Sequence, residues 1–418
     1  MCQVGIDIGT TTITVLVIEN EKLLDTITFD NEFLVTEASY EKIQDPIKIY
    51  SRVVEALNSL ISKYSVTSIG ITGQMHGILY VDLNKNPISP LYTWCDKRSD
   101  ELLDNKTYCE YISEVTGYTV NVGYGIGTHL YNTRNNLNKD NCYIMTIHDF
   151  IAFKLSDSLE PLMHSSNAAS LGLYDLKNNC FDNEAFKTLG LDINVMPKVT
   201  TTRSIIGKYN DIDVYVAIGD NQASYLGATK GAKALLFNVG TGSQISLNVN
   251  NYKLVDGIET RPYLNNDYLL VGASICGGKA FEALAKLFQE ISGKSLDDVY
   301  KMMVSSPLID DELVFETTFS GTRLDSSKKG SLNYITLDNF HRDYLVNAML
   351  KGMTNELYDF YKEMETDDFD EFVGAGNGLR KNPLLQQIVS NKFKMNLKIS
   401  EIKEEAAYGA ALFAKKED

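Results

Sequence analysis

The chain has 418 residues, a formal net charge of -16 at pH 7 and 44% hydrophobic residues. Its length predicts two domains, and its acidic excess excludes a nucleic-acid partner, which would need a basic face. The sequence has no signal-peptide pattern, no apolar run long enough to span a membrane and no metal-like spacing among its six cysteines, so we expect a cytoplasmic protein with reduced thiols and no membrane contact.

The first half of the chain predicts an α/β fold. The pattern indicates three strands over 3–30, a helix over 46–64 that starts with Pro46, and a buried strand over 66–71. This half is completed by a Gly-flanked loop at 72–77, a strand at 78–83, mostly helical pattern over 97–160 with a Gly-rich break at 117–127, a strand at 171–176 after a polar stretch, and a strand at 214–218 that leads into a helix.

The second half repeats this order. The halves are expected to meet at 229–234, which gives an N-terminal domain of residues 1–229 and a C-terminal domain of residues 230–418. The second domain is expected to contain a hairpin, further strands as far as 273, helices over 278–291 and 338–364, a buried strand over 369–373 that ends in a glycine-rich loop at 374–378, and helices over 382–391 and 404–415.

One stretch occurs twice, once in each half. Residues 6–12 (Ile-Asp-Ile-Gly-Thr-Thr-Thr) and 237–243 (Phe-Asn-Val-Gly-Thr-Gly-Ser) each place a Gly/Thr/Ser turn between two β-like runs, which predicts a hairpin. Glycines let the backbone approach a phosphate, and hydroxyl and N–H groups donate to its oxygens. The two copies therefore predict two lobes that face one nucleotide.

Two aspartates, Asp7 and Asp220, lie at the ends of buried strands, where a metal-binding or catalytic carboxylate is expected. Asp7 ends a buried strand, where a carboxylate is costly unless it is paired or near a cation such as the magnesium ion of ATP, although an Asx-turn would explain it equally well. Asp220 lies where a buried strand meets a helix, which suits the base that accepts the proton of an attacking alcohol. A helix N-cap is the alternative for Asp220, and local sequence alone favours it.

Polar residues beside the first lobe suit a polyhydroxylated ligand. Gln74 and His76 lie on the Gly-flanked loop, where they offer a donor and an acceptor, and a structural histidine is the alternative. Trp94, Asp96 and Arg98 alternate in a polar stretch, so the indole can form an apolar wall while the charged pair bonds hydroxyls. Taken alone, a surface salt bridge beside a buried tryptophan explains these three better.

Seven segments in this order resemble the FGGY family of carbohydrate kinases, in the superfamily that holds actin and hexokinase. The resemblance runs nearly end to end and rests on residues 7–11 (Asp-Ile-Gly-Thr-Thr), 73–77 (Gly-Gln-Met-His-Gly), 94–98 (Trp-Cys-Asp-Lys-Arg), 219–221 (Gly-Asp-Asn), 240–243 (Gly-Thr-Gly-Ser), 374–376 (Gly-Ala-Gly) and 405–411. Gly321 and Arg323 also match a Gly-x-Arg segment that is usual in the family.

The resemblance implies two ribonuclease-H-like domains of the actin and hexokinase ATPase type around a central cleft, with the sugar on the first and ATP with Mg²⁺ on the second. Asp220 is then expected to be the catalytic base, and Asp7 to hold Mg²⁺ directly or through water. Substrate contacts are expected from Gln74, Met75, His76, Trp94, Asp96, Arg98 and Asn221. Nucleotide contacts are expected from Gly9, Thr10, Thr11, Thr12, Gly240, Thr241, Gly242, Ser243, Gly374, Ala375, Gly376 and Asn382.

The same segments resemble ketose kinases within the family. Residues 167–172 (Asn-Ala-Ala-Ser-Leu-Gly) and 123–125 (Gly-Tyr-Gly) are similar to kinases of sedoheptulose, with kinases of xylulose as the alternative. The implied partners are a small ketose and ATP, and a homodimer is left open. A non-catalytic sugar sensor and an ATPase that acts on protein partners are rivals, which the retained Asp7 and Asp220 and the polar residues of the sugar side disfavour.

Overall fold

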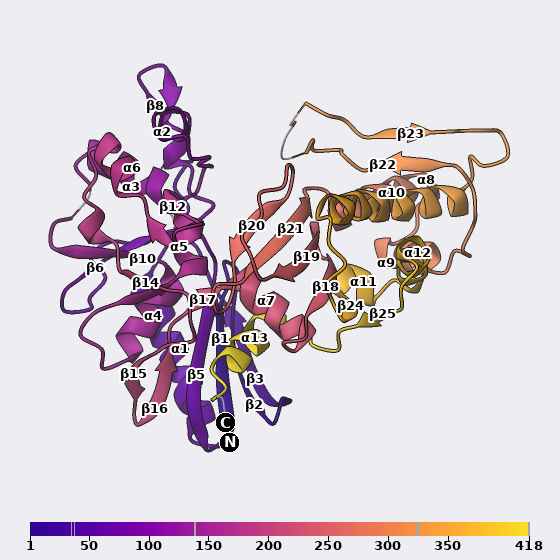
Figure 1. Cartoon of the computed structure of the whole chain (residues 1–418). Coiled ribbons are helices and arrows are strands. Elements are labelled where there is room, and N and C mark those ends of the chain that lie inside the picture. The colour runs from indigo at the N-terminus through magenta and orange to yellow at the C-terminus, as the bar shows by residue number, and fades with distance from the viewer. Residues whose placement is uncertain (35, 37, 138, 323–324, 326, 417–418) are drawn as a thin grey trace. The chain divides into compact units, whose positions relative to one another are not determined.

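The structure, a computed structural model, describes the whole chain apart from residues 35, 37, 138, 323, 324, 326, 417 and 418. Backbone contacts divide it into two compact units (Figure 1). Unit 1 comprises Met1–Lys230, Pro262–Asp267 and the C-terminal segment that begins at Glu404, and unit 2 comprises Gly231–Arg261 and Tyr268–Lys403. The chain therefore returns to unit 1 twice after its first exit, which a simple division into 1–229 and 230–418 does not include.

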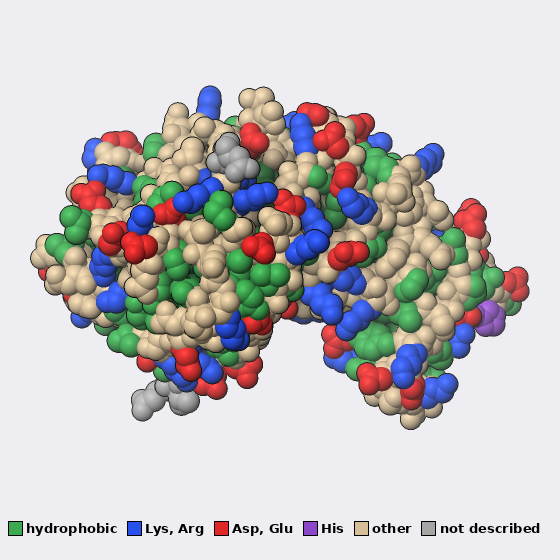
Figure 2. Space-filling view, turned by 90° about the horizontal axis from the view of Figure 1, so that it is seen from below, with side chains coloured by type: hydrophobic (Ala, Val, Ile, Leu, Met, Phe, Trp, Pro, Cys, Tyr) green, Lys and Arg blue, Asp and Glu red, His purple; other side chains and the backbone are tan. Residues whose placement is uncertain are grey.

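The surface mixes charges of both signs. On the face that Figure 2 presents, Lys and Arg side chains lie interspersed among Asp and Glu side chains. In the described residues, no helix is long and apolar enough to cross a membrane. All six cysteines lie within the described residues and are free thiols, as predicted.

The sheet of unit 1 is built on the first predicted hairpin. Strand β1 (Cys2–Ile8) pairs antiparallel with β2 (Thr12–Glu19), and β2 pairs antiparallel with β3 (Lys22–Asp30), so the three expected strands are confirmed. Strand β5 (Val66–Gly73) lies parallel to β1 on its other side. The order continues as β15 (Ile205–Tyr209), β16 (Ile212–Tyr215), β5, β1, β2 and β3, and β17 (Ile218–Gly219) also pairs with β5.

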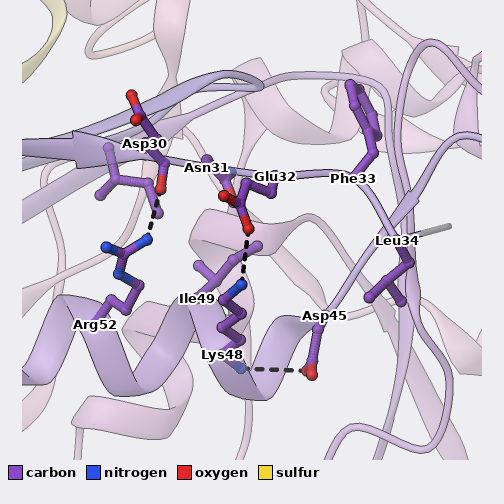
Figure 3. Close-up of a pocket in the computed structure, with 10 residues that line it drawn as sticks. Asp30, Asn31, Glu32, Phe33, Leu34, Asp45, Lys48, Ile49 and Arg52 are labelled. Carbon is purple, nitrogen blue, oxygen red and sulfur yellow. Dashed lines mark hydrogen bonds and ion pairs between the residues drawn. The ribbon is translucent and has the colours of Figure 1, made fainter.

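Helix α1 (Pro46–Ile61) packs beside this sheet. Its apolar face is buried at Val53, Leu57 and Leu60, and Asp45 caps its start by accepting from the backbone N–H groups of the first turn. Figure 3 shows the small pocket that α1 forms with the chain after β3, where Lys48 pairs with Glu32 at 2.9 Å. Its cavity volume is only about 40 Å³, so we do not expect a sugar to bind there.

The remaining helices and strands of unit 1, apart from the C-terminal helix, lie between residues 43 and 229. They are β4 (Ile43–Gln44), β6 (Leu79–Asp82), β7 (Leu91–Tyr92), β8 (Leu102–Leu103), β9 (Lys106–Thr107), α2 (Tyr108–Thr116), α3 (Gly125–Arg134), β10 (Cys142–Met145), α4 (Ile147–Leu155), β11 (Leu162–His164), α5 (Ser165–Leu171), β12 (Tyr174–Asp175), β13 (Cys180–Phe181), α6 (Asn183–Leu189), β14 (Lys198–Thr200) and α7 (Asp220–Thr229), with 3-10 turns at Arg98–Asp100 and Ile193–Val195.

Two predictions for this region need correction. The strand expected over 171–176 is wrong in part, because Leu171 ends helix α5 and the strand β12 is only Tyr174–Asp175. The His164 side chain caps the start of helix α5 by accepting a hydrogen bond from the Ser166 N–H. Gly172 follows the last helical residue, and its backbone φ of 99° is one that glycine adopts readily. The helical pattern expected over 97–160 is also interrupted by strand β10, which pairs with β6.

The C-terminal helix α13 (Glu405–Phe413) packs on the sheet of unit 1, and in Figure 1 it lies in yellow beside β1 and β5. Glycines in both strands allow a very close approach. A Cβ at Gly5 would stand 1.9 Å from the Ala407 carbonyl oxygen, and one at Gly70 would stand 1.8 Å from that of Ala410. The helix therefore rests on the bare backbone of the two central strands.

Unit 2 repeats the topology of the first sheet. Strand β18 (Ala234–Val239) pairs antiparallel with β19 (Ser243–Val249), which pairs antiparallel with β21 (Tyr268–Ser274), and β24 (Glu371–Ala375) lies parallel to β18. The strand order is β20 (Glu259–Pro262), β21, β19, β18, β24 and β25 (Leu397–Ile399). Since β18, β19, β21 and β24 pair as β1, β2, β3 and β5 do, the predicted internal repeat is confirmed.

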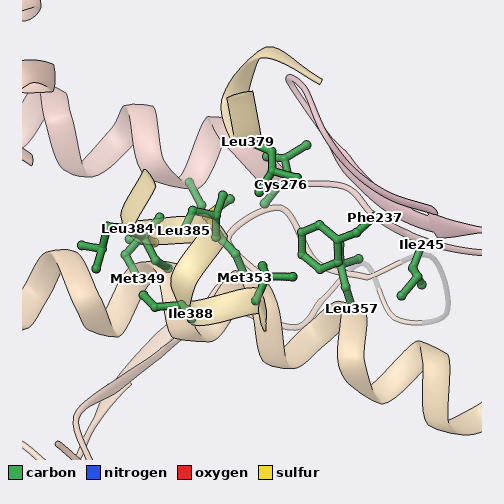
Figure 4. Packing of buried hydrophobic residues seen from close by; sticks show 14 of the residues in the cluster. Phe237, Ile245, Cys276, Met349, Met353, Leu357, Leu379, Leu384, Leu385 and Ile388 are labelled. Carbon is green, nitrogen blue, oxygen red and sulfur yellow. The ribbon is translucent and has the colours of Figure 1, made fainter. Parts of the chain in front are cut away.

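The core of unit 2 lies between this sheet and its helices. Figure 4 shows Phe237 and Ile245 of the sheet together with Met353 of α10 (Arg342–Glu363) and Leu385 of α12 (Pro383–Phe393), all of them buried. The remaining elements of this unit are α8 (Gly277–Ser292), α9 (Leu296–Val304), β22 (Val314–Glu316), β23 (Ser331–Asn333), α10 (Arg342–Glu363), α11 (Asn377–Arg380) and α12 (Pro383–Phe393).

Candidate active site

The carboxyl ends of three parallel strands meet at one edge of the unit 1 sheet. The register aligns Asp7 of β1 and Ile218 of β17 with Thr72 of β5, so the chain leaves all three strands at the same level. Asp7 is paired on both sides within β1, so it is a strand residue and does not start an Asx-turn. This edge is where α/β folds place ligand-binding side chains.

Carboxylates gather near Asp7. The pKa of Asp7 is raised to about 7, first because the carboxyl group is buried and then because Asp220 and Glu404 add negative charge nearby. Glu404 precedes helix α13, so the C-terminal segment brings this third carboxylate to the edge. Sequence analysis missed Glu404, because nothing in the local pattern indicates that the end of the chain returns to unit 1.

Asp220 is the first residue of helix α7. The N-cap position is held by Gly219, so Asp220 does not occupy the cap that local sequence favoured. The carboxylate accepts a hydrogen bond from Nδ2 of Asn221 at 2.9 Å, and the same Nδ2 lies 3.7 Å from the sulfur of Met75. The predicted base and two predicted substrate residues are therefore in contact.

The turn at residues 9–12 is held by side chains from elsewhere in unit 1. Nδ2 of Asn31 donates to the Gly9 carbonyl oxygen at 2.8 Å, and Nε2 of Gln44 donates to the Thr10 carbonyl oxygen at 2.8 Å. Sequence analysis missed both residues, because they lie after β3 and before α1, with no motif of their own. Their bonds fix the carbonyl groups of the turn within the protein.

Thr10 connects this turn to the predicted sugar side. Its hydroxyl accepts from the Trp94 indole N–H at 2.8 Å and donates to Oε1 of Gln74 at 3.3 Å, while Nε2 of Gln74 donates to Gln44 at 2.8 Å. Trp94 remains 49% exposed, which leaves much of the indole surface available to a ligand. Three predicted residues from three segments are thus brought together.

His76 is held in a defined orientation. Its Nδ1 lies 2.7 Å from the Ser170 carbonyl oxygen and must donate to it, so the neutral ring carries its acceptor at Nε2. The ring stacks on Tyr124 with centroids 4.4 Å apart, and the backbone has a φ of 71°, which is uncommon for a residue with a side chain. The two short segments at 123–125 and 167–172 therefore both contact His76.

Asp96 and Arg98 form a buried ion pair. Arg98 is 2% exposed and Asp96 is 0% exposed, and Nε of Arg98 donates to Oδ1 of Asp96 at 2.7 Å. The guanidinium also donates to Oδ1 of Asn132 at 3.0 Å and lies over the Tyr92 ring at 4.1 Å. The structure therefore shows this pair bonded within the protein, and a contact with sugar hydroxyls stays a prediction.

In unit 2 the second turn, at residues 240–243, packs against the start of helix α8. A Cβ at Gly278 would stand 2.2 Å from the Gly240 carbonyl oxygen, and the Lys279 N–H donates to the Thr241 carbonyl oxygen at 3.0 Å. The buried hydroxyl of Ser243 has no partner among the described residues. Sequence analysis predicted this helix over 278–291 but missed its contact with the turn, although the Gly-Gly pair before an amphipathic helix is a signal that could have indicated it.

The glycine-rich loop after β24 approaches the same strand. A Cβ at Gly376, whose φ is 85°, would stand 2.3 Å from the Val239 carbonyl oxygen, so only a glycine fits there. Asn382 is buried, and its Oδ1 accepts from the Leu385 N–H at 3.0 Å as the cap of α12. A contact of Asn382 with the purine stays a prediction, and Arg323 lies outside the described residues.

The residues present fit a triphosphate and a divalent cation. The open backbone at Gly240, where a Cβ would meet nothing within 4 Å, the unpartnered Ser243 hydroxyl and the start of helix α8 suit phosphate oxygens. The mutual repulsion of Asp7, Asp220 and Glu404 would be relieved by a cation. Within the described residues, no group of three His, Cys, Asp or Glu side chains could hold a metal ion.

Two sheets of one topology, each with a Gly/Thr/Ser turn, define the class of ATP-dependent phosphotransferases that share the ribonuclease-H-like fold. Comparison with known proteins narrows the class. Residues 2–223 match the N-terminal domain of the FGGY family of carbohydrate kinases. The chain belongs to this family and is an ATP-dependent carbohydrate kinase.

The similar proteins include kinases that are named for different sugars. Human sedoheptulokinase is 24% identical over 410 residues, which cover 87% of this chain and 84% of that protein. The xylulose kinase of Staphylococcus xylosus is 25% identical over 447 residues, which cover 98% and 90%. Among solved structures, xylulose kinase from Rhodospirillum rubrum has a TM-score of 0.85 at 17% identity, covering 99% of this chain and 89% of that one, and its likeness supports the fold.

Proposed function

We propose that this kinase phosphorylates the terminal hydroxyl of a ketose, with sedoheptulose as the first candidate and xylulose as the second. The observation that carries the proposal is the contact of Asp220, Asn221 and Met75 at the carboxyl edge of the sheet. The ring of His76 belongs to the same loop as Met75. Relatives named sedoheptulokinase and xylulose kinase support this substrate class without choosing between its members.

In the proposed reaction, the oxygen of the sugar hydroxyl forms a bond to the γ-phosphorus of ATP as the bond between that phosphorus and the β–γ bridging oxygen breaks. The hydroxyl proton passes to the Asp220 carboxylate, and ADP leaves. Gln74, Met75, His76, Trp94 and Asn221 orient the sugar in this proposal. The turn at 9–12 of unit 1 is proposed to bind phosphate oxygens. The same role is proposed for Ser243 and the glycine-rich turns of unit 2.

The role proposed for Asp7 is to hold Mg²⁺ directly or through a water molecule. When bound, Mg²⁺ would neutralise negative charge on the phosphates. Asp96 and Arg98 are proposed to support the Trp94 segment from within. Their buried bonds fix the chain that carries the indole.

A coupled assay for ADP release with sedoheptulose, xylulose, ribulose, gluconate and glycerol tests the proposal. We expect sedoheptulose or xylulose to be the best substrate and the Asp220→Asn variant to lose at least about 1,000-fold in kcat, since positioned acid–base groups contribute about 100- to 10,000-fold. Asp140→Asn, at an exposed aspartate of the same unit, is the matched control. Sugar binding by Asp220→Asn can be followed by the fluorescence of Trp94, which is the single tryptophan.

The result that would overturn the assignment of the base is near-normal turnover in Asp220→Asn. A clear preference for gluconate or glycerol would overturn the ketose assignment while leaving the base in place. Loss of sugar binding in Asp220→Asn would indicate that Asp220 contributes to binding as well as to chemistry.

A further inference from the structure

Helix α5 (Ser165–Leu171) lies between the two segments that carry His76 and Asp220. It is short and almost entirely buried, and it packs against both β12 and β17. Three of its residues use side-chain or backbone groups to bond segments outside the helix. The proposal for the reaction does not use these residues.

Ser166 bonds the strand that leads to the base. Its hydroxyl oxygen accepts from the Gly219 N–H at 2.9 Å and lies 2.8 Å from Nδ1 of His164. His164 also accepts from the Ser166 N–H at 3.2 Å, so the hydroxyl donates to His164 and accepts from Gly219. Gly219 directly precedes Asp220, and this bond therefore sets where helix α7 begins.

Asn167 bonds the residue that precedes strand β17. Its Nδ2 donates to the Ala217 carbonyl oxygen at 2.9 Å and to Oδ1 of Asp149 at 2.8 Å. Its Oδ1 lies 2.8 Å from Nε2 of His148, which donates to it. The side chain is fully buried, and all of these bonds run within unit 1. Asn167 thus joins α5, α4 and the segment that enters β17 in one hydrogen-bonded group.

Ser170 bonds the loop that carries the histidine. Its carbonyl oxygen accepts from Nδ1 of His76 at 2.7 Å, and its hydroxyl accepts from the His76 N–H at 3.3 Å. The hydroxyl donates in turn to the Asn167 carbonyl oxygen at 2.7 Å. The helix therefore holds His76 at one end and the approach to Asp220 at the other.

We propose that α5 is a positioning element that fixes Asp220 relative to His76, with Ser166 and Asn167 acting on the base and Ser170 acting on the histidine. This inference rests on the proposed function. Phosphoryl transfer gains most of its rate from positioning and charge, and a misplacement of about 1 Å can cost about 100-fold in rate. Loss of the Ser166 hydroxyl would leave the buried Gly219 N–H without an acceptor and release the start of α7.

Ser165 provides a matched control on the same helix. It is fully buried like Ser166, but its hydroxyl has no partner among the described residues. Ser166→Ala and Ser165→Ala therefore remove the same atom from neighbouring buried positions. Only the first substitution removes a bond to the segment that precedes Asp220.

The experiment measures kcat and the KM for ATP and sugar in both variants. We expect Ser166→Ala to lower kcat by about 10- to 100-fold with the KM for ATP unchanged, and Ser165→Ala to leave kcat unchanged. Equal kcat in the two variants would overturn the proposal. If Ser166→Ala does not fold, Ser166→Cys, with a weaker acceptor of similar size, replaces it.

A double variant separates positioning from general damage. If Ser166 acts through Asp220, Ser166→Ala will not lower the residual rate of Asp220→Asn any further. The same fold-loss in both backgrounds would overturn the proposal. Failure of the proposed function is distinct, since it would appear as normal turnover in Asp220→Asn itself.

Crystal structures of the two variants give a readout that needs no substrate. We expect the Asp220 carboxylate to be displaced relative to the His76 ring in Ser166→Ala and to be unmoved in Ser165→Ala. An unmoved carboxylate in both would overturn the proposal.

Discussion

Gly409 of helix α13 lies directly against Ala223 of helix α7, so that a Cβ at position 409 would stand 1.8 Å from the Ala223 carbonyl oxygen. The approach is mutual, because a Cβ at Gly227 of α7 would stand 2.0 Å from the Glu405 carbonyl oxygen. The two helices therefore pack backbone against backbone. Since α7 begins at Asp220, the end of the chain supports the helix that carries the proposed base.

We expect Gly409→Ala to destabilise unit 1 by about 3 kcal/mol or more, because the added methyl group meets a backbone atom that cannot move aside. Urea unfolding followed by Trp94 fluorescence reports this unit. Gly190→Ala, at an open position of the same unit where only a φ of 69° opposes an added Cβ, is the control and should cost about 1 to 2 kcal/mol. Wild-type stability in Gly409→Ala would show that the helices can separate without cost.

The Asp96–Arg98 pair gives a second prediction. Asp96→Asn leaves the buried guanidinium with only the more distant and more exposed carboxylate of Glu41, at 3.5 Å, so we expect a loss of about 3 kcal/mol in the free energy of unfolding. Removing the exposed partner in Lys187→Met, whose ion pair with Glu184 is at the surface, should change stability by less than about 1 kcal/mol. Equal effects in the two variants would contradict a structural role for the buried pair.

The buried carboxyl of Asp149 predicts a pH dependence of stability. Burial raises its pKa to about 7, although Thr146 and Asn167 donate to it. Because the folded pKa lies above the unfolded value of about 3.9, the folded protein keeps this proton where the unfolded chain has lost it. The stabilisation is fully present below about pH 4 and is lost as the pH rises to about 7.

This contribution can be isolated with Asp149→Asn, which cannot ionise. We expect the free energy of unfolding of the variant, minus that of the wild type, to rise by up to about 1.4 kcal/mol for each pH unit between pH 5 and 7 and then to level off. Urea titrations at a series of pH values measure it. A difference that does not change with pH would show that Asp149 keeps an ordinary pKa.

Because the Ser243 hydroxyl has no partner within the described residues, we expect its removal to weaken nucleotide binding without changing the stability of the protein. Ser243→Ala should weaken binding of a non-hydrolysable ATP analogue by about 10-fold, which corresponds to the loss of one hydrogen bond of about 1.4 kcal/mol. The thermal unfolding of the nucleotide-free protein should be unchanged. Titration calorimetry gives the affinity, and Ser165→Ala is the control that removes an unpartnered hydroxyl from the other unit.

The local patterns of the sequence were enough to predict much of the fold. The strands at 3–30, helix α1 and the hairpins at residues 6–12 and 237–243 follow from apolar periodicity and turn residues, which act between near neighbours in the chain. The prediction of a strand over 171–176 was wrong in part because it used the same local patterns. Helix α5, which takes Leu171 from the expected strand, depends on a cap from His164 and on buried bonds to Gly219, Ala217 and His76, which no local pattern contains.

Local motifs also identified some residues of the candidate site but not the partners of others. The motifs at 73–77 and 219–221 identified the residues that meet at the edge of the sheet, since strand ends place their loops together whenever the strands are parallel. No motif indicated that Arg98 is turned inward to Asp96 and Asn132, or that Asn382 caps a helix. A polar residue type permits several partners, and the partner is chosen by whatever the fold brings within about 3 Å.

By itself, the sequence determined that two similar lobes exist, that each carries a Gly/Thr/Ser turn, and that the chain resembles the FGGY kinases, because these features lie in short contiguous stretches. Only the tertiary structure decided that the last helix packs on the first unit, that Glu404 joins Asp7 and Asp220, and that α5 bonds both His76 and the approach to the base. These relationships join residues up to nearly four hundred positions apart, as in the bond from the Tyr408 hydroxyl to the Glu21 carbonyl oxygen. Burial and hydrogen bonding at such separations depend on the packing of the complete sheet, which no single segment encodes.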